Sequence, residues 1–102
     1  MPRARSAAWS RALDAVAHVP ATAGDVRSRN VSLGRRRTSV RFDAPTWRAL
    51  QGIMQREALT LDELCTLIDE AKPRGFSLTA AIRCYVVGYL IEAANARGKA
   101  LH

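Results

Sequence analysis

Residues 35–43 read Arg35-Arg36-Arg37-Thr38-Ser39-Val40-Arg41-Phe42-Asp43 and place four arginines within eight residues. Polar and apolar side chains alternate here, and successive side chains of a strand point to opposite faces. A strand over 37–42 would therefore present Arg37, Ser39 and Arg41 on one face and Thr38, Val40 and Phe42 on the other. One face would rest on a core, and the other would offer guanidinium and hydroxyl groups to a partner.

This short strand needs a pairing partner, because an isolated ribbon of this size is not stable in water. The sequence shows no obvious second strand. The segment 21–34 contains Gly, Ser and Arg without periodicity and is typical of a linker. We therefore expect the same strand of a second chain to pair with it, which predicts a homodimer with an exposed basic β-ribbon.

The positive charge is unevenly distributed along the chain of 102 residues, whose net charge is +7. Residues 35–42 carry four basic side chains and no acid, whereas residues 43–94 carry five basic and seven acidic ones. The predicted helical body is thus not basic, and the charge lies on the ribbon and the tails. Such segregation favours a polyanionic partner, either a nucleic acid or an acidic membrane surface.

Three regions follow from this pattern: a basic leader over 1–34, a domain over 35–96 and a basic tail over 97–102. Within the leader, Ala7–Ala17 is compatible with one short helix, because its apolar residues fall near one stripe. The composition of the leader fits a mobile nucleic-acid-binding arm and, as an alternative, an organelle transit peptide.

Two helices are predicted directly after the strand. Asp43 is suited to cap a helix over 44–58, in which Trp47 is expected to anchor the core rather than to stack on a base. Thr60 and the glutamate three residues later have the spacing of a capping box, which predicts a helix over 61–72.

A third helix is predicted over 78–96, with Ser77 as its cap. Apolar side chains surround it on almost every side, and a helix of this kind is normally buried. A chain of this size has too little protein to cover it, so a second subunit is expected to do so.

No constellation of catalytic or metal-binding residues is recognisable. Cys65 and Cys84 lack metal-ligand spacing and are expected to be small buried side chains in a reduced compartment, with a redox role as the alternative. Asp69 and Glu70 are adjacent on a helix and do not face each other, so they are unsuited to general acid–base chemistry. The sequence therefore predicts neither an enzyme nor a cofactor, and no apolar run is long enough to span a bilayer.

The order of basic strand, helix, polar turn and apolar helix resembles the ribbon-helix-helix DNA-binding domains of the Met and Arc repressor type. The resemblance runs from about residue 36 to about residue 94. The motifs Arg-Arg-Thr-Ser-Val-Arg-Phe, Leu-Thr-Leu-Asp-Glu-Leu and Leu-Thr-Ala-Ala-Ile-Arg are similar to those of a bacterial subfamily of these domains. The resemblance implies a mainly α fold, with an additional C-terminal helix and one short strand paired across a homodimer axis.

The resemblance also implies roles for individual residues. In this family the paired strands enter the major groove, and their outward side chains read base edges. Here those residues are Arg37, Ser39 and Arg41. Arginine can bond guanine bidentately, and serine can pair with several base edges.

Phosphates are expected to be held elsewhere. Arg35 and Arg36 lie just before the strand, and the family anchors phosphates on backbone N–H groups where the helix after the turn begins. That position is Thr60 and Leu61 if 61–72 is the family's second helix. If that segment is instead an insertion, the site moves to Ser77 and Leu78.

The function implied is sequence-specific binding of duplex DNA by a bacterial transcriptional regulator, most simply a repressor, in the cytoplasm at the nucleoid. One alternative is an antitoxin whose tail neutralises a toxin, although residues 95–102 are short and basic. Another is a dimerisation or adaptor module whose basic arm binds RNA or an acidic membrane. The expected partners are double-stranded DNA and a second copy of the chain, with no membrane and no cofactor.

Overall fold

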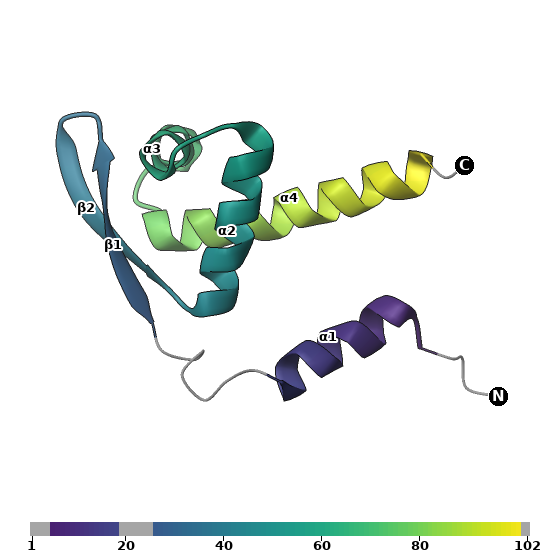
Figure 1. Cartoon of the computed structure of the whole chain (residues 1–102). Coiled ribbons are helices and arrows are strands. Elements are labelled where there is room, and N and C mark those ends of the chain that lie inside the picture. The colour runs from purple at the N-terminus through teal and green to yellow at the C-terminus, as the bar shows by residue number, and fades with distance from the viewer. Residues whose placement is uncertain (1–4, 19–25, 101–102) are drawn as a thin grey trace.

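The computed structural model describes residues 5–18 and 26–100. A β-hairpin packs against a group of helices (Figure 1). The predicted mainly α fold with an additional C-terminal helix is confirmed. The elements in chain order are α1 (Ala7–Ala17), β1 (Arg27–Leu33), β2 (Arg36–Phe42), α2 (Ala44–Glu57), α3 (Leu61–Ala71) and α4 (Leu78–Ala100).

The partner of the predicted strand lies in the same chain. β1 pairs antiparallel with β2, in a register that runs from Arg27 opposite Phe42 to Leu33 opposite Arg36. The expectation of an unstructured linker over 21–34 is therefore wrong for the part from Arg27 to Leu33; residues 21–25 lie outside the described part. The reason for expecting a second chain, that this strand has no partner within its own chain, is therefore also wrong, although within the described residues the other edge of β2 carries no strand.

A two-residue turn, Gly34-Arg35, closes the hairpin. Gly34 has a φ of +67°, in the left-handed region that glycine enters without steric cost. Type II′ hairpin turns need a positive φ at their first central residue only, and they match the right-handed twist of the strands they join. Gly34 therefore fixes the register in which the two strands pair.

Side-chain contacts hold both ends of β1 against the helices. At its start, Nε1 of Trp47 donates a hydrogen bond of 3.0 Å to the carbonyl oxygen of Arg27. Near its end, the N–H of Ser32 donates one of 3.0 Å to Oδ1 of Asp62 on α3. Val31 lies between these two points and is fully buried. β1 is thus an integrated part of the domain rather than an appended strand.

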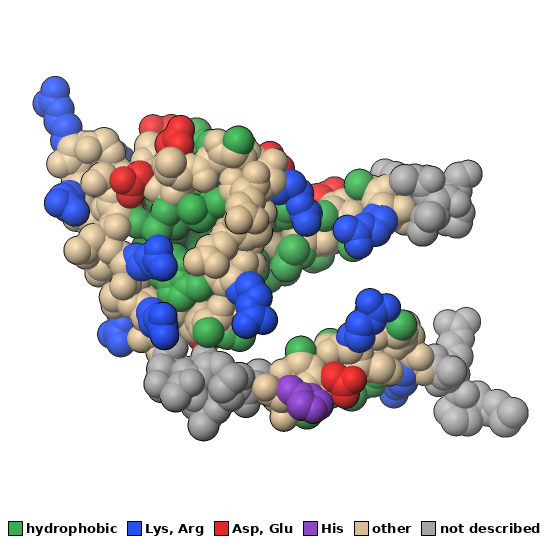
Figure 2. All heavy atoms as spheres, viewed as in Figure 1, with side chains coloured by type: hydrophobic (Ala, Val, Ile, Leu, Met, Phe, Trp, Pro, Cys, Tyr) green, Lys and Arg blue, Asp and Glu red, His purple; other side chains and the backbone are tan. Residues whose placement is uncertain are grey.

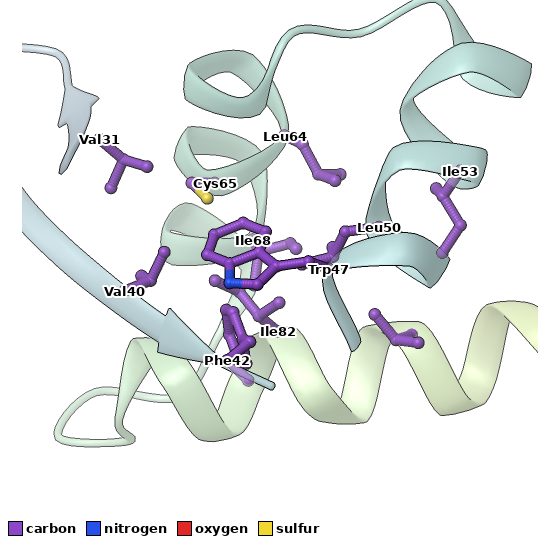
Figure 3. Packing of buried hydrophobic residues seen from close by; sticks show 12 residues of the cluster. Val31, Val40, Phe42, Trp47, Leu50, Ile53, Leu64, Cys65, Ile68 and Ile82 are labelled. Atoms are coloured by element: carbon purple, nitrogen blue, oxygen red, sulfur yellow. The ribbon is translucent and has the colours of Figure 1, made fainter. Parts of the chain in front are cut away.

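The core lies between the inner face of the hairpin and helices α2, α3 and α4 (Figure 3). Trp47 is 7% exposed and meets the ring of Phe42 edge-on, with centroids 5.2 Å apart. This confirms its prediction as a core anchor and the inward orientation of Val40 and Phe42. The buried residues are Val31, Val40, Phe42, Trp47, Leu50, Ile53, Leu64, Cys65, Ile68, Ala81, Ile82 and Val86.

The helix starts agree with the caps expected from the sequence. The carboxylate of Asp43 accepts the N–H of Thr46 at 2.9 Å at the start of α2. Thr60 and Glu63 form a complete capping box at the start of α3. α1 matches the helix expected in the leader, but none of its residues is buried.

α4 is only half covered by its own chain. Its side chains Ala81, Ile82 and Val86 are buried, whereas Val87 is 58% exposed and Ile91 is 53% exposed. The prediction that this helix has more apolar surface than one chain can cover is therefore confirmed. Cys84 lies on its exposed side, so the expectation that both cysteines are buried holds for Cys65 alone.

Candidate nucleic-acid interface

The outer face of the hairpin is polar along its whole length. Antiparallel pairing places three pairs of side chains opposite one another on this face. All are exposed except Ser32, which is half-buried. The pairs are Ser28 with Arg41, Asn30 with Ser39, and Ser32 with Arg37.

The three residues expected to read bases, Arg37, Ser39 and Arg41, thus lie together on one exposed face, as the alternation in the sequence predicted. Sequence reasoning missed Ser28, Asn30 and Ser32, which double the polar face. Two signals for β1 were available: the alternation of Val31 and Leu33, and a glycine placed to begin a two-residue hairpin turn. Arginines at the other inward positions of β1 obscured the pattern.

The hairpin is strongly basic. Residues 27–42 contain six arginines and no acidic residue. In Figure 2, Lys and Arg side chains lie along the hairpin, whereas Asp and Glu side chains lie over α3. The separation of charge inferred from the sequence therefore corresponds to a physical separation on the surface.

The two arginines before the predicted strand differ in their surroundings. Arg35 is exposed in the turn. The guanidinium of Arg36 lies 3.0 Å from the carboxylate of Asp69 on α3, which Lys72 also approaches at 3.7 Å. Asp69 offsets part of the charge of Arg36, so Arg35 has the freer guanidinium for a phosphate.

The start of α3 offers less to a phosphate than expected. Oε1 of Glu63 accepts the N–H of Thr60 at 3.0 Å, and Oγ1 of Thr60 accepts the N–H of Glu63 at 3.2 Å. The N–H of Thr60, and to a smaller extent its hydroxyl, hold the pKa of the Glu63 carboxyl below its ordinary value. The first turn thus carries the carboxylates of Asp62 and Glu63, which would repel an anion at Thr60 and Leu61.

The alternative anchor, at the start of α4, has different electrostatics. Oγ of Ser77 accepts the N–H of Ala80 at 3.2 Å, and the first turn of α4 contains no acidic residue. Nearby, the guanidinium of Arg83 lies 5.5 Å from the ring of Phe42 at the end of β2. The region around Ser77 therefore suits an anion better than the region around Thr60.

The remaining reactive groups show no arrangement for chemistry. Burial raises the pKa of the Cys65 thiol to about 11, with the charge of Asp62 as a smaller cause, so this thiol is a poor nucleophile at neutral pH. Within residues 5–18 and 26–100, no group of three or more His, Cys, Asp or Glu side chains is placed to hold a metal ion. No helix in the same residues is long and apolar enough to cross a membrane.

Comparison with known families matches residues 26–90 to the ribbon-helix-helix domain. The match covers more than half of the chain and includes the hairpin, α2, α3 and most of α4. The chain belongs to the ribbon-helix-helix domain family. Neither the curated proteins nor the solved structures contain a match.

Ribbon-helix-helix domains in general bind DNA, form dimers, and act as transcription regulators or antitoxins. They are binding modules rather than enzymes. The family match starts at residue 26, one residue before β1 begins. In this chain the hairpin is therefore part of the matched domain, not an addition before it.

Proposed function

We propose that the β1–β2 hairpin binds duplex DNA in the major groove and reads base edges with its outer face. The observation that carries the proposal is this exposed two-stranded face, with two arginines, four neutral polar side chains and no carboxylate. Paired strands lie about 4.8 Å apart. A two-stranded ribbon of that width fits a major groove of about 12 Å.

The side chains on this face match the donors and acceptors of base edges. Arg37 and Arg41 are suited to the O6 and N7 acceptors of guanine, and Asn30 to N6 and N7 of adenine. Asn30 stands opposite Ser39 at the middle of the face. Because the two strands carry different residues, one hairpin would read a site without internal symmetry.

The in-chain hairpin bears on how two copies associate. If β2 also paired with β2 of a second copy, the sheet would have four strands and a width of about 14 Å between its outer backbones. Such a sheet is too wide for the groove. We therefore propose that the homodimer forms elsewhere.

The face of α4 that contains Val87, Leu90 and Ile91 is the surface proposed for dimerisation. These side chains are between 49% and 58% exposed, and a second copy would remove them from water. Each is already about half covered, so burying the remainder contributes about 1 kcal/mol per side chain. Each protomer of the dimer would then contribute one complete ribbon.

Arg35 and Arg36 remain the proposed phosphate contacts. Arg36 is the weaker of the two, because it forms an ion pair with Asp69. The N–H groups at Thr60 and Leu61 stay in the proposal as weaker contacts, because carboxylates surround them, and Ser77 is the better placed helix start. The biological role that fits these features is a transcriptional regulator, most simply a repressor, in the bacterial cytoplasm.

Selection from a pool of random duplex DNA tests the proposed function. We expect enrichment of a short site with guanine and adenine positions and no internal two-fold symmetry, present once or as two separated copies. Competition with single-stranded RNA and with anionic lipid vesicles should leave the complex intact. Failure to enrich any sequence, or equal affinity for RNA or vesicles, would contradict the proposal.

A further inference from the structure

Three arginines surround a hollow where β1 and α2 begin. The hollow has a volume of about 250 Å³ and is lined by Arg27, Arg29, Ala44, Trp47, Arg48 and Gln51. A water molecule occupies about 30 Å³, so the hollow has room for a hydrated anion. It lies at the opposite end of the hairpin from the Gly34 turn, away from the carboxylates of α3.

Contacts with Trp47 hold the Arg29 side chain and the backbone of Arg27 beside the hollow. The guanidinium of Arg29 lies 5.4 Å from the centroid of the Trp47 ring, and Nε1 of Trp47 binds the carbonyl oxygen of Arg27. Arg48 follows Trp47 on α2 and brings the third guanidinium to the same hollow. The cluster is therefore held by both strand and helix.

The cluster has no acidic partner within the described part of the chain. The ion pairs found there join Asp69 to Arg36 and Lys72, and no carboxylate lines the hollow. Asp43, the acid nearest in sequence, is engaged with the N–H of Thr46 and is influenced by the charge of Arg83. Three permanent positive charges in one hollow repel one another, and a bound anion would relieve that repulsion.

We infer that this hollow binds a backbone phosphate of the DNA whose bases the hairpin reads, an inference that rests on the proposed function. Groove walls run along both edges of a ribbon in the major groove, and the edge of β1 near Ser32 is occupied by Asp62 of α3. Arg27, Arg29 and Arg48 flank the other end of the same strand. Arginine is the residue best suited to bidentate contacts with phosphate.

The surroundings favour a DNA phosphate over a free nucleotide. The ring of Trp47 is 7% exposed and carries Arg29 over it, which leaves no aromatic face on which a base could stack. Gln51 adds an amide that can donate to a phosphate oxygen, and Ala44 brings the positive end of the α2 dipole to the hollow. These groups recognise a phosphate and nothing attached to it.

Salt dependence of DNA binding separates this role from base reading. The test variant is Arg27→Gln with Arg48→Gln, and the control is Arg56→Gln with Arg97→Gln, which removes the same charge from exposed positions elsewhere. We expect the test variant to bind a selected site and a random duplex about tenfold more weakly, each by the same factor. The slope of log K against log salt should become shallower by about one to two. The control should keep a slope close to that of the parent.

Each contrary outcome overturns a defined part of the account. An unchanged slope and affinity in the test variant would remove the phosphate assignment while the parent still binds DNA. A loss confined to one base position would make these residues base readers instead. Failure of the parent protein to bind any duplex would remove the proposed function itself.

A titration with inorganic pyrophosphate tests whether the hollow instead binds a free anion. Binding is followed by the fluorescence of Trp47 in a Trp9→Phe background. We expect no saturation below about millimolar concentration. Tight saturation that Arg27→Gln with Arg48→Gln abolishes, with DNA affinity unchanged, would assign the hollow to a free phosphate and overturn the inference.

Discussion

The hairpin and α4 both leave one face exposed, but the two faces differ in chemistry. The outer face of the hairpin presents arginine, serine and asparagine, whereas the open side of α4 presents Val87, Leu90 and Ile91. A polar basic face gains little from contact with protein core atoms and much from a polyanion, while an apolar face gains from being covered. Exposure alone therefore does not identify a partner: the chemistry of the hairpin suits DNA, and that of α4 suits another copy of the chain.

Removal of the two arginines proposed to read bases has the largest expected effect. Arg37→Ala with Arg41→Ala should weaken specific binding by about 2–6 kcal/mol, or roughly 30-fold to over ten-thousandfold, at about 1–3 kcal/mol per contact. Fluorescence anisotropy on a selected duplex measures the loss. The oligomeric state should not change, since neither side chain lies on α4. Parental affinity in this variant would mean that the hairpin does not read DNA.

Acidic substitutions on the exposed face of α4 should weaken dimerisation and leave DNA binding intact. Val87→Asp with Ile91→Asp should raise the dimer dissociation constant at least about a hundredfold, because two apolar side chains per protomer lose their burial. Sedimentation equilibrium measures the change, and binding to a single site should persist. The control, Gln55→Glu with Arg74→Gln, makes the same change in net charge away from this face. A dimer that is equally tight in both variants would place the interface elsewhere.

The hairpin turn provides a smaller and local test. Gly34→Ala should destabilise the domain by about 1–2 kcal/mol, because alanine is strained at a φ of +67° although no atom lies within 4 Å of the new Cβ. Gly52→Ala is the matched control, since Gly52 lies in the exposed middle of α2 with equally open surroundings. It should stabilise the domain by about 0.5–1 kcal/mol. Urea unfolding measures both, and the same sign in the two variants would contradict the assigned turn.

The helix caps predict the smallest effect, a loss of stability in acid. The hydroxyl of Thr46, and next its N–H, hold the pKa of Asp43 below its ordinary value, and Thr60 does the same for Glu63. A carboxyl whose pKa is lower in the folded state stabilises the fold above its unfolded pKa, and this stabilisation is lost as the pH falls through the folded value. The free energy of unfolding should therefore fall below about pH 4.5. Asp43→Asn should make that dependence shallower, and an unchanged pH profile would count against the cap.

Much of the fold was predictable because it follows from short-range rules. The alternation over 37–42 gave both faces of β2, and the caps at Asp43, Thr60 and Ser77 gave the helix starts. β1 was not predictable by the same rule, because Arg27 and Arg29 occupy two of its four inward positions. The guanidinium of Arg29 lies over the ring of Trp47 at the rim of the core. A hydrophobic pattern does not register an arginine used in this way.

The candidate site was predictable only on the strand whose pattern was visible. The alternation predicted that Arg37, Ser39 and Arg41 share one exposed face, whereas Asn30 and the arginine hollow depend on a strand that the sequence did not reveal. Thr60 shows a different difficulty. The same capping-box spacing that predicted the start of α3 also occupies the N–H of Thr60, one of the two groups proposed for a phosphate.

The mass of a DNA complex tests the central claim, that one chain forms a complete reading ribbon. The dimerisation variant, Val87→Asp with Ile91→Asp, would be mixed with a duplex that carries one copy of the selected site and studied by sedimentation velocity. The account predicts one chain per duplex, with an affinity that Arg37→Ala and Arg41→Ala abolish. Two chains bound together on that single site, with no complex of one chain at any concentration, would show that the ribbon is built from two subunits and would contradict the claim.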